Sequence, residues 1–158
     1  IHPRLGSQMY KGTPYYDVFK EYLGRTKHSL CYNGDINTLE DLQKLDSKWE
    51  KCDKFMLGRG LIARPGMLGG LHKIDEDLMS QEEWNRFKRF HDELVEGYYA
   101  YMCEDRNTLF KMKELWFYMI GSFEDADKLA KKIKKTERIS EYEKIISTLF
   151  ETCALREE

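Results

Sequence analysis

Short apolar runs separated by helical stretches characterise the first 70 residues of the chain. Two of these runs, residues 30–32 and 54–57, have the length and apolar character of buried strands, and each ends in a turn that contains glycine. Residues 15–23 show the periodicity of a helix, and Ile1 is placed as the last residue of a preceding strand. This alternation of strands and helices predicts an α/β fold.

A helix is expected between the two strands. Leu39, Leu42 and Leu45 recur at three-residue spacing, and Asn37 or Thr38 supplies a side-chain oxygen that can cap the start of a helix. A strand, a helix and a strand in this order favour parallel neighbours joined by a right-handed crossover.

The pattern changes after Gly69 and Gly70. Glycine becomes rare, proline disappears, and apolar residues recur with a period of 3.6, which predicts helices. A capping-box pattern at residues 80–83 opens the first helix, and others are expected over 108–120, over 124–135 and from 140 onward. The expected buried faces of the first and last helices comprise Trp84, Phe87, Phe90, His91 and Leu94, and Ile145, Ile146, Leu149 and Phe150. We therefore expect two domains, an α/β segment over 1–70 and a small antiparallel helical bundle over 71–158.

Composition sets limits on the function. The chain has 158 residues, of which 41% are hydrophobic and 34% charged, which suffices for one ordinary core. The formal net charge of -2 excludes a generally polyanion-binding composition, so phosphate binding would need a local basic patch. The four cysteines are scattered, without metal-ligand spacing, which indicates reduced thiols in a cytoplasmic protein and no metal site. No stretch has the roughly 20 apolar residues of a membrane-spanning helix.

The two glycine turns are the first candidates for chemistry. Gly34 and Gly58 place backbone N–H groups at the C-terminal ends of successive strands, and Arg59 adds a planar, permanently charged guanidinium. In (β/α)₈ barrels the phosphate site lies in the loops after the seventh and eighth strands. The alternative interpretation is that both glycines only make tight turns, that Asn33 and Asp35 favour turns, and that Arg59 is a surface charge.

The residues of these turns resemble a known family. The segment Tyr32-Asn33-Gly34-Asp35-Ile36, followed by Phe55-Met56-Leu57-Gly58-Arg59-Gly60 and Pro65, is similar to the C-terminal barrel signature of tRNA-dihydrouridine synthases. The opening Ile1-His2-Pro3-Arg4 and the later Tyr10-Lys11-Gly12 match the preceding strand end and loop of that family. The resemblance is close over residues 1–70 and weaker over 71–158.

The resemblance implies that residues 1–70 form the last part of a TIM barrel, from the end of strand six to strand eight, with FMN on its C-terminal face. In this arrangement His2 would approach the flavin. The ribityl and phosphate groups would be lined by Asn33, Gly34 and Asp35, and the phosphate itself would be bound by Gly58 and Arg59. The implied reaction is flavin reduction by NADPH, then hydride transfer to a uridine of tRNA to give 5,6-dihydrouridine.

The resemblance also indicates what this chain lacks. The family's catalytic acid is a cysteine after an early strand, and none of the four cysteines here matches its position, so we expect it upstream of this chain. A complete barrel has about 250 residues, and residues 1–70 supply at most about three of its eight strand-helix units. We therefore expect an inactive fragment whose open sheet edges favour dimerisation or swapping.

A basic stripe points to RNA. Residues 128–138 contain six basic residues against one acid, although a solvated helix face is an equally good interpretation of this stripe alone. The family's C-terminal helical domain helps to hold tRNA, but its basic-basic-His run is replaced here by Met112-Lys113-Glu114. The RNA-binding candidates are Arg4, Lys113, Lys131, Lys132 and Lys135. The aromatic residues Trp84, Phe87, Phe90, Trp116 and Phe117 are assigned to the core, because aromatic side chains at helical spacing usually pack there.

Two other functions remain open. The chain could belong to an FMN-dependent TIM-barrel oxidoreductase that acts on a small molecule. It could also be a non-enzymatic RNA or protein interaction module attached to a degenerate barrel.

Overall fold

The computed structural model describes residues 1–71 and 76–156, and the side chains of these residues outside 70–80. The chain divides into two compact units, Ile1–Leu61 and Ile62–Glu158. The division follows Leu61, and the expected boundary at residue 70 lies inside the second unit.

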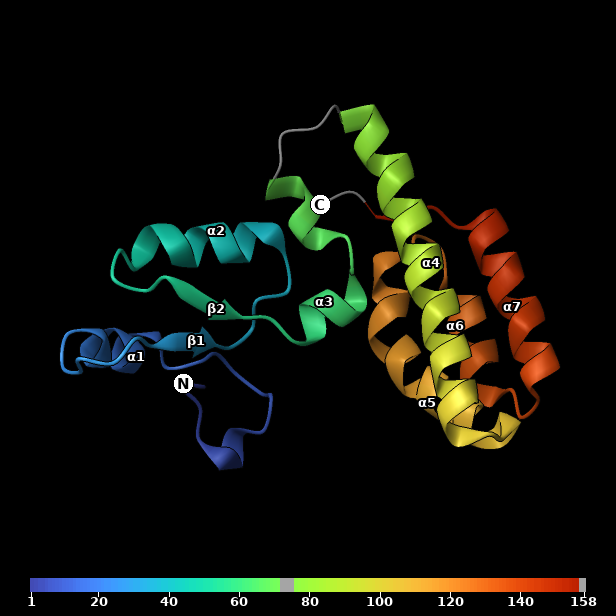
Figure 1. Ribbon diagram of the computed structural model, residues 1–158, viewed down its shortest axis with the longest axis horizontal. Coiled ribbons are helices and arrows are strands. Elements are labelled where there is room, and N and C mark those ends of the chain that lie inside the picture. The colour runs from blue at the N-terminus through green and yellow to red at the C-terminus, as the bar shows by residue number, and fades with distance from the viewer. Residues whose placement is uncertain (72–75, 157–158) are drawn as a thin grey trace. The chain divides into compact units, whose positions relative to one another are not determined.

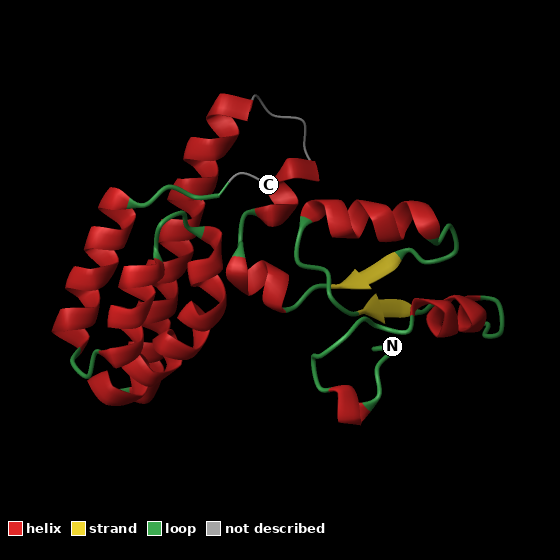
Figure 2. Ribbon diagram, turned by 180° about the vertical axis from the view of Figure 1, so that it is seen from behind, coloured by secondary structure: helices red, strands yellow, loops and turns green. Residues whose placement is uncertain are grey.

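The first unit is built around two short parallel strands (Figures 1 and 2). In chain order its elements are η1 (Gly6–Gln8), α1 (Tyr16–Leu23), β1 (Cys31–Asn33), α2 (Leu39–Lys48) and β2 (Lys54–Met56). The strands pair in parallel with Tyr32 opposite Phe55, which confirms the predicted arrangement. Among the described residues the sheet has two strands, and this pair alone does not show the expected part of a barrel.

Ile1 lies beside β1 although it is not part of a strand. Its backbone nitrogen donates to the carbonyl of Cys31 at 2.5 Å, and its carbonyl accepts from the N–H of Asn33 at 2.9 Å. This pair of bonds is the pattern that a parallel neighbouring strand makes. Since alternate backbone groups of β1 pair with β2, Ile1 lies on the opposite edge of β1.

Local chemistry explains the helix that joins the strands. Thr38, rather than Asn37, caps α2: its hydroxyl accepts from the N–H of Asp41 at 3.0 Å, and the Asp41 carboxylate accepts from the N–H of Thr38 at 3.1 Å. The unit's core is formed by the buried side chains Phe19, Tyr32, Ile36, Leu45, Trp49 and Cys52.

Helices make up the second unit (Figure 1). The short helix α3 (Arg59–Ala63) spans the junction between the units, and η2 (Met67–Leu71), α4 (Glu76–Met102), α5 (Asp105–Met119), η3 (Ile120–Ser122), α6 (Asp127–Lys135) and α7 (Ile139–Thr152) follow. The expected start of the first long helix at residues 80–83 is wrong, because α4 begins at Glu76. The side chain of Ser80, on which that capping box depends, lies outside the described residues.

Aromatic side chains fill the core of the second unit. Phe87, Trp116 and Phe150 are buried as expected, and the Phe87 ring meets that of Phe123 edge-on at 5.0 Å. Phe117 contradicts the expectation, since 77% of its surface is exposed. The reason is helical geometry. Residues three and four positions apart share one face of a helix, so Phe117 lies on the same face of α5 as Lys113, Glu114 and Phe110. This face includes exposed residues, whereas Trp116 lies on the buried face.

Candidate functional site

The carboxyl ends of β1 and β2 bring the predicted turn residues together with the loop that follows Ile1. Asp35 lies two residues beyond β1 and has a φ of 46°, a left-handed conformation that aspartate adopts more readily than most residues. Arg59 lies at the start of α3, three residues after β2. Because the carboxyl ends of parallel strands lie at the same edge of a sheet, the turn after β1 and the turn after β2 meet there.

Asp35 bridges two arginines. One carboxylate oxygen accepts from Arg59 at 3.0 Å, and the other forms an ion pair with Arg4. The Arg4 side chain is only 2% exposed and also donates to the carbonyls of Lys11 and Gly12, each at 2.8 Å. Arg4 therefore ties residues 11 and 12 to the turn after β1.

The charges of this cluster favour an anion. Two guanidinium groups, from Arg4 and Arg59, share the single carboxylate of Asp35, which leaves one net positive charge. The Nε of Arg4 is buried without a hydrogen-bond partner in the structure. Arg59 keeps 36% of its side chain exposed, so its guanidinium can reach a ligand.

Tyr10 holds the other side of Arg59. The guanidinium carbon of Arg59 lies 4.2 Å from the centre of the Tyr10 ring, which is close enough for a cation–π interaction. In the sequence Tyr10 is only part of a loop that matches the family, and its role is not predictable because the stack joins residues 49 positions apart. The tyrosine and the aspartate together restrict how the guanidinium can point.

Glycines keep two of the turns close-packed. A Cβ atom on Gly34 would lie 2.9 Å from the hydroxyl oxygen of Tyr32 and 3.4 Å from Cδ2 of His2. A Cβ atom on Gly60 would lie 2.5 Å from the carbonyl oxygen of Ile36, a clash with backbone. Only glycine fits either position without a shift of its neighbours.

Space remains beside the other candidates. A Cβ atom on Gly58 would meet nothing within 4 Å, so the backbone next to Arg59 is open. Asn33 is half-buried, and among the described residues its side chain has no hydrogen-bond partner. His2 is exposed and lies beside Gly34.

A buried tyrosine completes the surroundings of Gly34. Tyr32 is fully buried, its hydroxyl has no hydrogen-bond partner in the structure, and burial raises its pKa far above the ordinary value. The hydroxyl therefore stays protonated and can donate. Unpartnered buried polar atoms are rare in folded proteins, and two of those found here, on Tyr32 and Arg4, belong to residues of this site or next to it.

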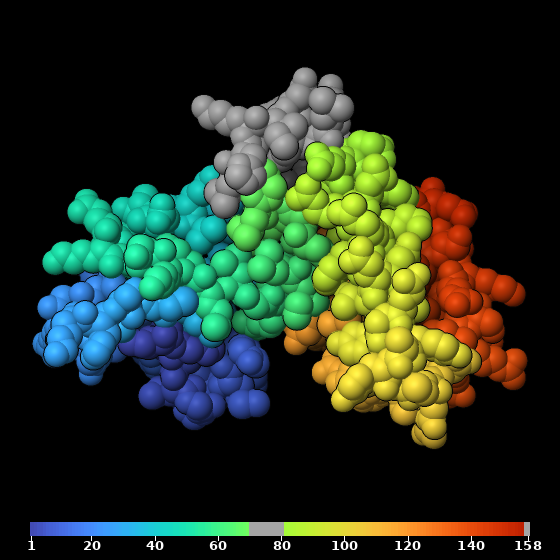
Figure 3. All heavy atoms as spheres, in the orientation of Figure 1, coloured from blue at the N-terminus to red at the C-terminus, as the bar shows by residue number. Residues whose placement is uncertain are grey.

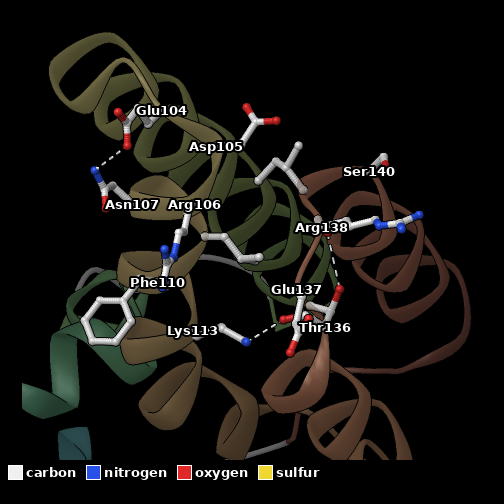
Figure 4. Close-up of a pocket in the computed structure, with 12 residues that line it drawn as sticks. Glu104, Asp105, Arg106, Asn107, Phe110, Lys113, Thr136, Glu137, Arg138 and Ser140 are labelled. Atoms are coloured by element: carbon white, nitrogen blue, oxygen red, sulfur yellow. Dashed lines mark hydrogen bonds between the residues drawn. The ribbon is translucent and has the colours of Figure 1, made fainter.

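The predicted RNA-binding residues occupy different places. Arg4 belongs to the cluster around Asp35, where its burial favours a structural role. Lys113 is half-buried, and its ammonium donates to the carbonyl of Thr136 at 2.5 Å (Figure 4). Lys131, Lys132 and Lys135 are exposed on α6, and in the described part of the chain none of the three forms an ion pair.

A family comparison decides what kind of protein carries this site. The family model described as dihydrouridine synthase (Dus) matches residues 1–155. The chain belongs to the dihydrouridine synthase family. Dihydrouridine synthases are oxidoreductases that act on tRNA and generally depend on flavin. The recognition made from the turn residues is therefore confirmed, and the match also covers the helical part of this synthase chain, where the resemblance is weaker.

Candidate metal sites and membrane-spanning helices are absent from the described part of this dihydrouridine synthase chain. Across residues 1–71 and 76–156, no group of three or more His, Cys, Asp or Glu side chains is arranged to hold a metal ion. None of the described helices is both long and apolar enough to cross a membrane.

Proposed function

We propose that this chain carries the flavin-phosphate side of the active site and the RNA-facing helical domain of a tRNA-dihydrouridine synthase, which reduces uridine to 5,6-dihydrouridine with NADPH. The observation that carries the proposal is the cluster of Arg4, Asp35 and Arg59 at the ends of parallel strands. Its net positive charge and family membership favour a phosphorylated flavin over other anions.

The residues of the cluster fit the phosphate of FMN. Arg59 presents a guanidinium whose orientation is restricted by Tyr10 and Asp35, and such a planar group can donate two parallel hydrogen bonds to a phosphate. The open backbone at Gly58 leaves room for phosphate oxygens beside it. On this proposal Asn33, Gly34 and Asp35 lie along the ribityl and phosphate side, and His2 faces the flavin.

FMN, when bound, supplies the hydride chemistry, and NADPH is its reductant. The chain's own residues bind and orient the cofactor: Arg59 fixes the phosphate, and Asp35 holds Arg59 in place. On this proposal the acid that protonates the uracil ring is a cysteine elsewhere in the complete enzyme.

The parallel pair supports the TIM-barrel proposal. Ile1, β1 and β2 lie side by side in the order expected for the ends of strands six, seven and eight. In such barrels the loops after the last two strands carry the phosphate site, which is where Asp35 and Arg59 lie. We propose that the rest of the barrel belongs to the same enzyme and that this part is inactive alone.

The basic face of α6 supports the RNA-facing role. Lys131, Lys132 and Lys135 are exposed, and five of the six basic residues predicted there lie on α6. Phosphate contacts by such lysines would add salt-dependent affinity that does not depend on sequence.

An FMN titration tests the proposed site. The chain is titrated with FMN and with riboflavin, which lacks the phosphate, and flavin fluorescence is followed. We expect FMN to bind more tightly than riboflavin and Arg59→Ala to weaken FMN binding by about tenfold to a hundredfold, with little effect on riboflavin. Arg25→Ala, which changes an exposed arginine of the same unit, serves as the control.

Equal affinity for FMN and riboflavin in the wild type, or an Arg59→Ala variant with wild-type affinity for FMN, would contradict the phosphate site. If the chain binds neither flavin, the same comparison is made on a polypeptide that also carries the proposed rest of the barrel.

A further inference from the structure

Helices α5 and α6 border a groove of about 710 Å³. Its apolar lining includes Trp116, Ile120 and Ile133, and the aromatic residues Phe110 and Phe117 stand at its edge. The groove lies wholly within the second unit.

Two phenylalanines are exposed at this groove to an unusual degree. Phe110 is 68% exposed and Phe117 is 77% exposed. They lie seven residues apart on α5, which places them on the same face and about 10 Å apart along the helix axis. The rings of Phe117 and Tyr118 are perpendicular, with their centres 5.2 Å apart. Tyr118 therefore does not stack face to face on Phe117. Exposed rings gathered at an apolar groove mark a binding surface rather than a core.

The charges around the groove are mainly positive. Lys113, Lys131 and Lys134 line it, against a single acid, Glu114. Glu114 already forms an ion pair with Lys111 at 3.0 Å. Lys131 and Lys134 are exposed and have no ion-pair partner among the described residues, so both are available to a ligand.

Lys113 shapes the groove. Its ammonium is held by the carbonyl of Thr136, just beyond the end of α6, which joins the two helices that form the walls (Figure 4). The side chain is therefore fixed as part of the wall, and the charges of the groove without a partner in the described part of the chain are those of Lys131 and Lys134.

We propose that this groove binds an unpaired base of an RNA strand, with the base stacked on Phe117 and the adjoining phosphates on Lys131 and Lys134. Sites for single-stranded nucleic acid have two components. Aromatic rings stack on the bases, and neighbouring basic side chains bind the phosphates of the nucleic-acid backbone. A surplus of free lysines favours a polyanion over an apolar protein segment as the occupant. The inference rests on the proposed RNA-facing role of the helical domain and names the part of the RNA that it recognises.

The test uses the whole chain and a short single-stranded RNA that carries 2-aminopurine, whose fluorescence falls when the base stacks. We expect binding to quench this fluorescence. The Phe117→Leu variant should show no quenching and bind the RNA about tenfold more weakly. The Phe117→Trp variant should retain the quenching and the wild-type affinity, because tryptophan can also stack on a base. Because Phe117 is exposed, neither change is expected to affect folding, which circular dichroism checks.

Two further variants separate stacking from charge. Replacing Lys131 and Lys134 with Ala should reduce the dependence of affinity on salt by about 0.7 in logarithmic slope for each lysine, while the bound base is still quenched. Tyr101→Leu changes an equally exposed aromatic residue outside the groove and should behave as the wild type. Tyr101 lies near the end of α4, and the described atoms of this helix from residue 81 onward are coloured yellow-green to yellow in Figure 3.

The outcomes distinguish the base-binding site from the proposed RNA-facing role of the helical domain. If the chain binds tRNA and Phe117→Leu changes neither affinity nor quenching, the base site is overturned and the RNA-facing role stands. If the wild type binds neither tRNA nor the short RNA, both are overturned. Self-association that Phe117→Leu abolishes, with RNA binding unchanged, would make the groove a protein interface and also overturn the inference.

Discussion

Asp35 accepts hydrogen bonds from two arginines, Arg4 in the segment after Ile1 and Arg59 at the start of α3. Removing its charge would leave the Arg4 guanidinium, which is 2% exposed, without a counter-ion. Breaking a buried ion pair by changing one partner costs several kcal/mol, and the partial exposure of Asp35 reduces the cost here. We therefore expect Asp35→Asn to lower the free energy of unfolding of the first unit by about 2 kcal/mol.

Amide hydrogen exchange of residues 31–61 measures this change, because it reports the opening of the first unit separately from the second. Asp53→Asn is the matched control, since Asp53 is exposed and has no ion pair within the described part of the chain. Equal exchange in the two variants would mean that Arg4 does not need Asp35.

At the same scale, the sequence predicted the turn residues but not their partners. Asn33-Gly34-Asp35 and Gly58-Arg59 could be chosen because glycine, aspartate and arginine have local properties that suit phosphate turns. The contact of Asp35 with Arg4 joins residues 31 positions apart and depends on the fold, so Arg4 was assigned to RNA. Phe117 was assigned to the core for a similar reason, since composition does not indicate which face of α5 is covered.

Among the elements, α4, α5 and α7 are linked by a buried polar network. Trp116 Nε1 donates to the Tyr142 hydroxyl at 2.7 Å, and that hydroxyl lies 2.7 Å from Nε2 of His91. The Asp92 carboxylate can only accept, and it lies 2.9 Å from Nδ1 of His91, so the ring proton is on Nδ1. Burial lowers the pKa of His91 and favours the neutral ring, so Nε2 accepts from the Tyr142 hydroxyl, which in turn accepts from the indole.

This network predicts how the stability of the helical bundle depends on pH. Burial lowers the pKa of His91, with the positive charge of Lys88 acting in the same direction and Asp92 opposing it. His91 therefore binds a proton more readily in the unfolded chain than in the folded one. The stability that neutral His91 contributes is fully present above the pKa of an unfolded histidine, and it is lost as the pH falls towards the pKa of His91 in the folded protein. We expect the free energy of unfolding to fall as the pH is lowered from about 7.5 to about 5.5.

Urea denaturation followed by circular dichroism measures this, since the signal comes mainly from the helices of the second unit. His91→Gln should flatten the dependence over this interval, and His28→Gln, which changes an exposed histidine, should retain it. An unchanged slope in His91→Gln would show that another group controls the pH dependence.

Helix and strand positions were largely predictable, because they depend on local periodicity. Both strands, the capped α2 and the last helix were expected close to where they lie. The start of α4 was missed because the residue types at 80–83 match a capping box, whereas α4 begins at Glu76. The role of His91 could not be predicted, since its partner Tyr142 lies 51 positions away.

At the scale of the whole molecule, the family match joins two units with different chemistry. The first unit carries a cationic cluster suited to the phosphate of a flavin, and the second carries a basic helix and an aromatic groove suited to RNA. An enzyme that reduces a base within tRNA needs both. The change in periodicity predicted a division near residue 70, whereas the chain divides after Leu61. The proposal that further barrel strands belong to the enzyme does not follow from periodicity and rests on the resemblance.

The most direct test of the proposed function is the formation of dihydrouridine in unmodified tRNA, with NADPH as reductant, by a polypeptide that includes the proposed rest of the barrel. We expect a yellow protein that produces dihydrouridine, and an Arg59→Ala variant that loses FMN and activity together while remaining folded. A folded complete protein that is colourless and forms no dihydrouridine would contradict it.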